Sequence, residues 1–332
     1  MSHVSKEFRL TTQSLVCAAS IVFSILGAPS ALAQTYPNKP IRLVVPFVPG
    51  GGSDAAARIL ARGMTERFGQ QVVVDNRGGA NTIIGTELVA KSRPDGYTLL
   101  VCTGSLTINP SLYKLNYDTL EDLTPVTMYL RGVLLLVVHP SLPVHNVKQL
   151  VALAKAKPGE LTFSSYGAGS PGHLAGELFK SMTGTNMLHI PFKGSAPSIS
   201  EVLAGRISMT FGVLAPVWPH VKAGRLRPVA FATPERRPDH PDIPTIGETV
   251  TGFEAVGMNG ICAPSGMPKE IIQKLHSVIS DVMTNRELRT KLIDGGADIV
   301  ERPLPPEEFG AFVRSEIAKW KKVVDGAGVK VN

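Results

Sequence analysis

Residues 41–54 read IRLVVPFVPGGGSD, and this stretch decides the fold class. Residues 41–47 are mostly apolar and β-branched, which predicts a buried strand. The glycines that follow predict a tight turn, because glycine adopts backbone angles that other residues avoid. Residues 55–68 then place apolar side chains, from Ile59 to Phe68, on one face of a predicted helix. The stretch is therefore a strand, a turn and a helix, which is the first part of a βαβ unit.

The same alternation continues along the chain. Further strands are predicted at 71–75, 97–102, 133–138, 161–164, 188–192, 207–211 and 229–232, with helices at 83–91, 147–155, 172–182, 196–204 and 217–223. This alternation predicts an α/β fold with mostly parallel sheets flanked by helices. Two longer amphipathic helices, 269–283 and 306–324, are expected to pack back on the first domain.

The length of 332 residues is typical of about two domains, at roughly 100–200 residues per domain. The chain has no internal repeat and no flexible linker between the predicted elements. We therefore expect the chain to cross several times between two interleaved domains.

The first thirty-odd residues have the three parts of a secretory signal peptide. Basic Lys6 and Arg9 precede an uncharged apolar stretch at 15–26, and Ala31-Leu32-Ala33 fits the small-x-small cleavage rule. The apolar stretch is too short to cross a bilayer, which takes about 20 residues. We expect cleavage after Ala33 and export of the remaining chain.

The formal net charge of +7 first invites a nucleic-acid interpretation, which the placement of the charges disfavours. No run of five like charges occurs, and the few aromatic residues do not alternate with basic ones, so stacking platforms are absent. A dispersed positive field would at most steer small anions.

Cysteine and histidine usage says little about cofactors. The exported chain keeps Cys102 and Cys262, for which a disulfide is possible, although two separate, small buried residues are the favoured interpretation. The eight histidines show no metal-ligand spacing, so no metal site is expected. Gly50-x-Gly52-x-x-Ala55 with Asp75 loosely fits a dinucleotide fingerprint, but export and the preceding prolines argue against a nicotinamide cofactor.

Four glycine-rich turns between predicted strands and helices are the most informative feature. We call them the first (residues 46–54), second (75–82), third (164–173) and fourth (189–195) glycine loops. Each could be only a tight turn. A glycine turn that leads into a helix also presents free N–H groups and a partial positive charge, which together favour an anion.

An exported hydrolase is an alternative that the residues leave open. Ser170 and His173 lie three residues apart in the third glycine loop and could act as nucleophile and base. No Gly-x-Ser-x-Gly elbow surrounds Ser170. A helix N-cap at Ser170 with Pro171 at the first helical position explains the same spacing more simply.

The chain resembles the Bug-type (TctC-like) substrate-binding proteins of tripartite tricarboxylate transporters. The resemblance covers the exported chain, and its most specific parts are Pro46-Phe47-x-Pro49-Gly50-Gly51-x-x-Asp54, Asn76-x-x-Gly79-Ala80, Gly169-Ser170-x-x-His173-Leu174-Ala175-Gly176-Glu177 and Pro191-Phe192-Lys193-Gly194. Each motif is weak by itself, and together they are specific.

This resemblance implies a periplasmic, monomeric solute-binding protein with a type II-like two-lobed fold. The lobes would be residues 35–137 plus 256–332 and residues 138–255, with the ligand cleft between them. The ligand would be a small carboxylate, such as a di- or tricarboxylate or an aromatic acid, delivered to transporter membrane subunits. A ligand sensor that signals to a membrane partner is the alternative within the same fold.

The resemblance and the glycine loops together predict the binding residues. The expected set is Phe47, Gly50, Gly51, Ser53, Asp54, Gly79, Ala80, Asn81, Ser105, Ser165, Gly169, Ser170, His173, Phe192 and Gly212. Gly212 stands where the family usually has an aspartate, so we also expect a ligand without an amino group.

Overall fold

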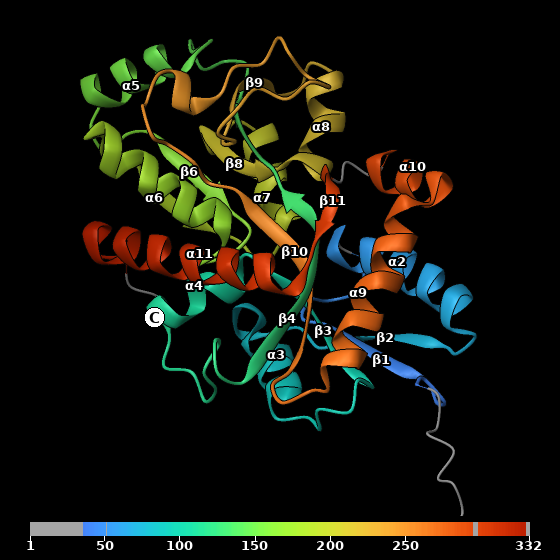
Figure 1. Ribbon diagram of the computed structural model, residues 1–332. Coiled ribbons are helices and arrows are strands. Elements are labelled where there is room, and N and C mark those ends of the chain that lie inside the picture. Colours follow the sequence, from blue (N-terminus) through green and yellow to red (C-terminus); the bar gives the residue numbers. More distant parts are fainter. Residues whose placement is uncertain (1–35, 51, 295–297, 330–332) are drawn as a thin grey trace, which may run out of the picture. The chain divides into compact units, whose positions relative to one another are not determined.

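The computed structural model describes residues 36–50, 52–294 and 298–329. The predicted signal peptide and its cleavage site after Ala33 lie outside these residues, as does Gly51 of the first glycine loop. The predicted alternation of strands and helices is confirmed, and the strands form two sheets (Figure 1).

The first sheet has six strands in the order β11-β4-β10-β3-β1-β2. These strands are β1 (Ile41–Val45), β2 (Val72–Asn76), β3 (Thr98–Thr103), β4 (Leu123–Gly132), β10 (Gly257–Pro264) and β11 (Asp298–Leu304). Every residue of β1 except Arg42 is buried, which explains its nearly continuous apolar sequence.

The second sheet has five strands in the order β7-β6-β8-β5-β9. They are β5 (Leu134–Val138), β6 (Thr162–Ser165), β7 (Leu188–Pro191), β8 (Met209–Val213) and β9 (Arg227–Phe231). Because β4 belongs to the first sheet and β5 to the second, the chain changes sheets at Val133, before the lobe boundary predicted after residue 137. It returns to the first sheet between β9 and β10.

The helices mostly follow the strands, as in βαβ units. They are α2 (Gly52–Phe68), α3 (Ile83–Ala90), α4 (Ser105–Leu112), α5 (Val147–Ala156), α6 (Pro171–Thr183), α7 (Ser195–Leu203), α8 (Leu214–Lys222), α9 (Lys269–Thr284), α10 (Arg286–Asp294) and α11 (Pro306–Ala327), with short 3-10 turns η1 (Ala80–Thr82) and η2 (Ile246–Glu248).

The prediction of mostly parallel sheets needs a correction, because both sheets are mixed. The β2-β1-β3 and β7-β6-β8 portions are parallel. Every antiparallel pair involves β4, β5 or β10, the strands next to the points where the chain changes sheets. A strand that enters a sheet from the neighbouring one need not follow a helical crossover, so it can run in the opposite direction.

The sequence predicted that helix α11 packs on the first domain. In the structure it packs on both sheets. It lies against α4, β4 and α6 (Figure 1). Near its start, Phe309 and Val313 join the core that contains Val44 of β1. Near its end, Trp320 joins the core that contains Phe163 of β6. One helix thus buries apolar side chains in the cores of both sheets.

Cys102 on β3 and Cys262 on β10 form a disulfide, so the favoured interpretation of two separate residues is wrong. The antiparallel ladder places Cys102 opposite Gly260 and Cys262 opposite Leu100, which brings the two cysteines together. A bridge across a sequence separation of 160 residues stabilises a fold by about 5 kcal/mol in the chain-entropy model. It ties together the strands that carry one wall of the site described next.

Candidate functional site

A cavity of about 300 Å³ lies at the carboxyl ends of β3 and β8. Thr103 ends β3 and Val213 ends β8, and both line the cavity. Each strand passes almost directly into a helix, so the strand ends and the helix starts are in the same place. Ligands of open α/β folds bind at this position, outside the carboxyl ends of the strands.

Five helices of the described chain begin at this cavity. The first turns of α2, α4, α6, α7 and α8 contribute lining residues, among them Ser53, Ser105, Pro171, Ser195 and Ala215. A helix start leaves up to four N–H groups without intrahelical partners and carries a partial positive charge. Within the described chain, no side chain caps α4, α7 or α8. The convergence of helix starts therefore favours an anion.

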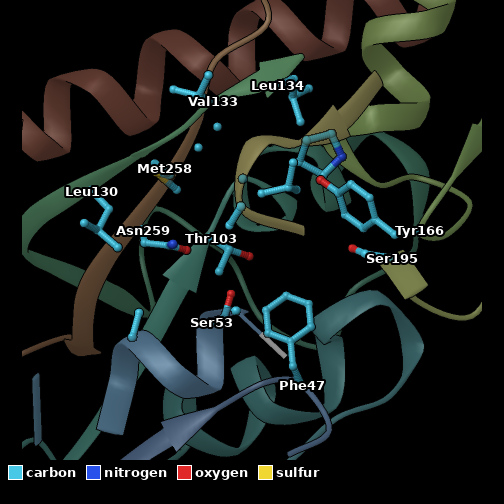
Figure 2. Close-up of a pocket in the computed structure, with 18 of the residues that line it drawn as sticks. Phe47, Ser53, Thr103, Leu130, Val133, Leu134, Tyr166, Ser195, Met258 and Asn259 are labelled. Carbon is cyan, nitrogen blue, oxygen red and sulfur yellow. The ribbon is translucent and has the colours of Figure 1, made fainter. Parts of the chain in front are cut away.

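The lining is aliphatic over its left and upper parts and carries polar side chains elsewhere. Figure 2 shows Leu130, Met258, Val133 and Leu134 in these parts, with the Asn259 amide beside Leu130 and the Tyr166 phenol on the right, while Thr103 lies at the centre, Ser53 near Phe47 and Ser195 below Tyr166. Among the described lining residues, Arg131 is the single charged side chain and none is acidic. Burial raises the pKa of the Tyr166 phenol, so this lining residue stays neutral at neutral pH.

Three of the predicted binding residues, Phe47, Ser53 and Ser105, line the cavity. Gly51 lies outside the described residues. The other predicted residues do not line this cavity: Gly50, Asp54, Gly79, Ala80, Asn81, Ser165, Gly169, Ser170, His173, Phe192 and Gly212. Their contacts show what they do instead.

Asp54 organises the first glycine loop from behind. Its carboxylate accepts hydrogen bonds from the Gly50 N–H (2.9 Å), the Asn76 side chain (2.9 Å) and Arg58 (3.1 Å). Burial alone would raise the pKa of Asp54, but the hydrogen bonds from Arg58, Gly50 and Asn76 hold it below its usual range. The side chain is therefore an ionised anchor that shapes the loop beside the cavity.

Asn81 links the second glycine loop to α4 and to the third glycine loop. Its amide donates to Asn109 Oδ1 (2.8 Å) and to the Gly169 carbonyl (3.2 Å), and Asn109 donates in return to the Asn81 carbonyl (2.8 Å). Ala80, Asn81 and Thr82 all have left-handed backbones, with φ of 45°, 48° and 77°. The bonds to the buried Asn109 compensate for this unfavourable conformation.

His173 and His189 form a stacked pair beneath the third glycine loop. Their ring centroids are 3.7 Å apart, and His173 Nδ1 accepts from the Gly169 N–H (3.0 Å). Ser165 Oγ lies 2.7 Å from His189 Nε2. Burial and then the charge of Lys180 lower the pKa of His173 to about 4, while burial, His173 and Lys180 lower that of His189 to about 3. Both rings are neutral at neutral pH.

Ser170 and His173 form a helix cap and not a nucleophile and base. Ser170 Oγ accepts the backbone N–H of His173 (3.4 Å), with Pro171 at the start of α6. The His173 ring atom Nδ1 is occupied by Gly169. Ser170 is 1% exposed, so an incoming substrate could not reach its hydroxyl. This geometry removes the pair on which the hydrolase alternative rested.

Most of the cavity wall was not predicted from the sequence. Tyr166 and Ser195 belong to the third and fourth glycine loops, so reading every side chain of those loops would have found them. Nothing in the sequence marks Leu130, Leu134 and Met258 as lining residues, because they have the pattern of ordinary core residues of strands. Only the meeting of the strand ends reveals them as lining.

The described part of the chain contains neither a cluster of metal-binding side chains nor a helix that could span a membrane. No three His, Cys, Asp or Glu side chains in residues 36–50, 52–294 and 298–329 are grouped closely enough to hold a metal ion. None of the helices built from these residues is both long and apolar enough to cross a membrane.

Comparison with known proteins agrees with this architecture. The family model described as the tripartite tricarboxylate transporter family receptor (TctC) matches residues 56–329. Protein BugT of Bordetella pertussis is 37% identical over 303 residues, which cover 90% of this chain and 92% of BugT.

Two solved structures are also similar. The R. palustris protein Rpa4515, solved with adipate, is 36% identical with a TM-score of 0.81, covering 89% of this chain and 99% of that one. MatC from Rhodopseudomonas palustris, solved with bound malate, is 26% identical with a TM-score of 0.76, covering 87% of this chain and all of MatC. Since the family model covers most of the chain, the chain belongs to the tripartite tricarboxylate transporter receptor family (TctC), to which the Bug-type proteins are related.

Proposed function

We propose that this chain is a periplasmic solute-binding protein that captures a small carboxylate in the described cavity and delivers it to transporter membrane subunits. The observation that carries the proposal is the convergence of five helix starts, three of them without a side-chain cap, on one cavity. Charge-assisted hydrogen bonds contribute about 1.5–3 kcal/mol each, so three or four suffice for micromolar affinity. The carboxylates bound by Rpa4515 and MatC support the same ligand class.

The two sheets would act as two lobes that close on the ligand. The predicted division into residues 35–137 plus 256–332 and residues 138–255 belongs to this proposal, with the first crossing moved to Val133 because β5 pairs with β8 and β9. Small rotations at Val133 and at the return segment before β10 would open and close the cavity. Helix α11 limits this motion, since it packs in both cores.

Export, cleavage after Ala33 and a monomeric state complete the proposal. Expression of the full chain with its leader, followed by periplasmic extraction, mass measurement and light scattering, tests these points together. A mature mass that starts at Gln34 and a monomer mass are expected. Retention of the intact chain in the cytoplasm would contradict the proposed location without affecting the proposed ligand.

A thermal-shift panel of carboxylates tests the function. A ligand at 100 times its Kd stabilises the folded state by about 2.7 kcal/mol, so at least one acid should raise Tm by several degrees. The panel includes the amide of each acid, which keeps the shape and removes the charge. If amides stabilise the protein as well as acids do, carboxylate recognition is wrong.

A further inference from the structure

We infer that the cavity selects a carboxylate carried on an apolar body of roughly ten non-hydrogen atoms, over hydroxylated or multiply charged acids. This inference rests on the proposed function and specifies its substrate class. The cavity volume of about 300 Å³ is at the lower end of the range for small-molecule sites, so the ligand must be compact.

The charges around the cavity set the first limit. Arg131 is the single cation among the described lining residues, on the exposed part of β4, and no lining residue is acidic. The helix starts can satisfy one carboxylate. Away from the helix starts, the described side chains that could bind a second carboxylate are exposed Arg131 and the neutral Asn259 and Tyr166, so such a group would lose more hydrogen bonds to water than it regains. An ammonium group would likewise find no carboxylate among these lining residues.

The aliphatic wall sets the second limit. Leu130, Val133, Leu134 and Met258 are each 2–3% exposed, yet all four line the cavity (Figure 2). Their side chains offer no hydrogen-bond partner to a hydroxyl group, and the Asn259 amide beside Leu130 is the one polar side chain labelled on this side, whereas an aliphatic chain or a ring removes their remaining surface from water. Malate and citrate carry hydroxyls and carboxylates on nearly every carbon and cannot use this wall.

The polar side chains lie where they orient a single acid group. Ser53 and Ser195 place their hydroxyls at the starts of α2 and α7, and Thr103 places its hydroxyl at the end of β3, away from the aliphatic wall (Figure 2). A ligand with one carboxylate toward these groups and its apolar part toward Leu130 and Met258 satisfies both sides.

Calorimetric titration of the exported protein with benzoate, hexanoate, benzamide, malate and citrate tests the inference. Benzoate or hexanoate should bind at least tenfold more tightly than malate or citrate, and benzamide should bind at least tenfold more weakly than benzoate. If malate or citrate binds as tightly as the apolar acids, this inference is overturned and the proposed function stands. If benzamide binds as well as benzoate, the proposed function fails as well.

A matched pair of variants locates the selectivity in the aliphatic wall. Val133→Thr adds a hydroxyl to the cavity wall at nearly constant volume, while Val138→Thr makes the same change at the other end of β5, away from the cavity. Val133→Thr should weaken the apolar acid about tenfold and leave malate unchanged, and Val138→Thr should not change the ratio between the two acids. An unchanged ratio in Val133→Thr contradicts the inference.

Discussion

The first glycine loop lies at the cavity, where Phe47 and Ser53 line the wall, whereas the second glycine loop is engaged in hydrogen bonds to other parts of the protein. Both follow strands of the same parallel ladder and both lead into helices. The difference lies in the side chains. Asp54 shapes the first loop from behind, and the described lining still includes the start of α2. Asn81 instead joins the second loop to Asn109 and Gly169.

This comparison shows that a glycine turn before a helix is not by itself a ligand site. A helix start becomes available to a ligand when no side chain caps it and when the surrounding elements leave a cavity in front of it. The second and third glycine loops meet these conditions less well, since their polar groups bond to one another. Asn81 and Gly169 bond these two loops to each other, and Tyr166 and Pro171 of the third loop also line the cavity together with residues of the first and fourth.

Acidification is expected to have the largest effect, because it lowers the unfolding free energy through the stacked histidines beneath the third glycine loop. His173 and His189 have pKa values lowered to about 4 and 3, so their neutral forms stabilise the fold fully above pH 6.5. As pH falls below 6.5 the unfolded chain takes up protons that the folded chain refuses. The unfolding free energy should therefore drop by about 2 kcal/mol per histidine between pH 6.5 and 5.

Urea denaturation across this pH range measures the effect. The pKa of Asp54 is also lowered, but this carboxyl is ionised in both the folded and the unfolded state above pH 5. It therefore does not contribute to the change in unfolding free energy over this range. His189→Phe should remove about half of the pH dependence. A free energy that stays constant from pH 7 to 5 would show that the two histidines titrate in the folded protein as they do in the unfolded chain.

Asn81→Ala is expected to cost about 2 kcal/mol, because it leaves the Oδ1 atom of fully buried Asn109 without its donor. Affinity for the carboxylate should change by less than about threefold, since Asn81 does not line the cavity. Chemical denaturation and calorimetry measure the two quantities. Asn186→Ala, at an exposed position, is the matched control and should stay within about 0.5 kcal/mol. Loss of binding without loss of stability would reverse the assignment of the two loops.

In contrast to Asn81→Ala, Ser53→Asp should weaken ligand binding without lowering stability. A carboxylate in the first turn of α2 is favourable for the helix, so stability should stay equal or rise slightly. The same charge faces the cavity and repels an acid, which should weaken binding at least tenfold, or about 1.4 kcal/mol. Ser53→Asn, without the charge, should weaken binding much less. Equal losses for the two variants would mean that the start of α2 does not contact the ligand's carboxylate.

Ala80→Gly is expected to have the smallest effect, a gain of about 0.5 kcal/mol. Ala80 is exposed with φ of 45°, and glycine adopts this conformation without the steric penalty of a Cβ atom. Ala55→Gly, at an exposed position inside α2, should instead lose about 1 kcal/mol. Thermal denaturation of the two variants provides the measurement. If both substitutions change the stability in the same direction, the second glycine loop is not held in the left-handed conformation.

Local sequence was enough to predict the α/β class, the strand that precedes the first glycine loop and the N-cap at Ser170. These features depend on neighbours in the chain: apolar periodicity, glycine turns and a serine before a proline. Of the predicted binding residues, Phe47, Ser53 and Ser105 line the cavity, and their contact with a ligand stays a prediction.

The remaining features depend on contacts between segments that are distant in the chain, and such contacts cannot be predicted from one sequence. The register of β10 against β3 brings Cys102 to Cys262, and the entry of β5 and β10 from the neighbouring sheet makes both sheets mixed. Leu130 and Met258 differ from core residues only because two sheets leave a space between their strand ends. Backbone conformation is set over a few residues, so the sequence alone determines the elements and turns. The use of each turn, as a cavity wall or as a link, is decided by packing, because only packing determines which N–H groups remain free.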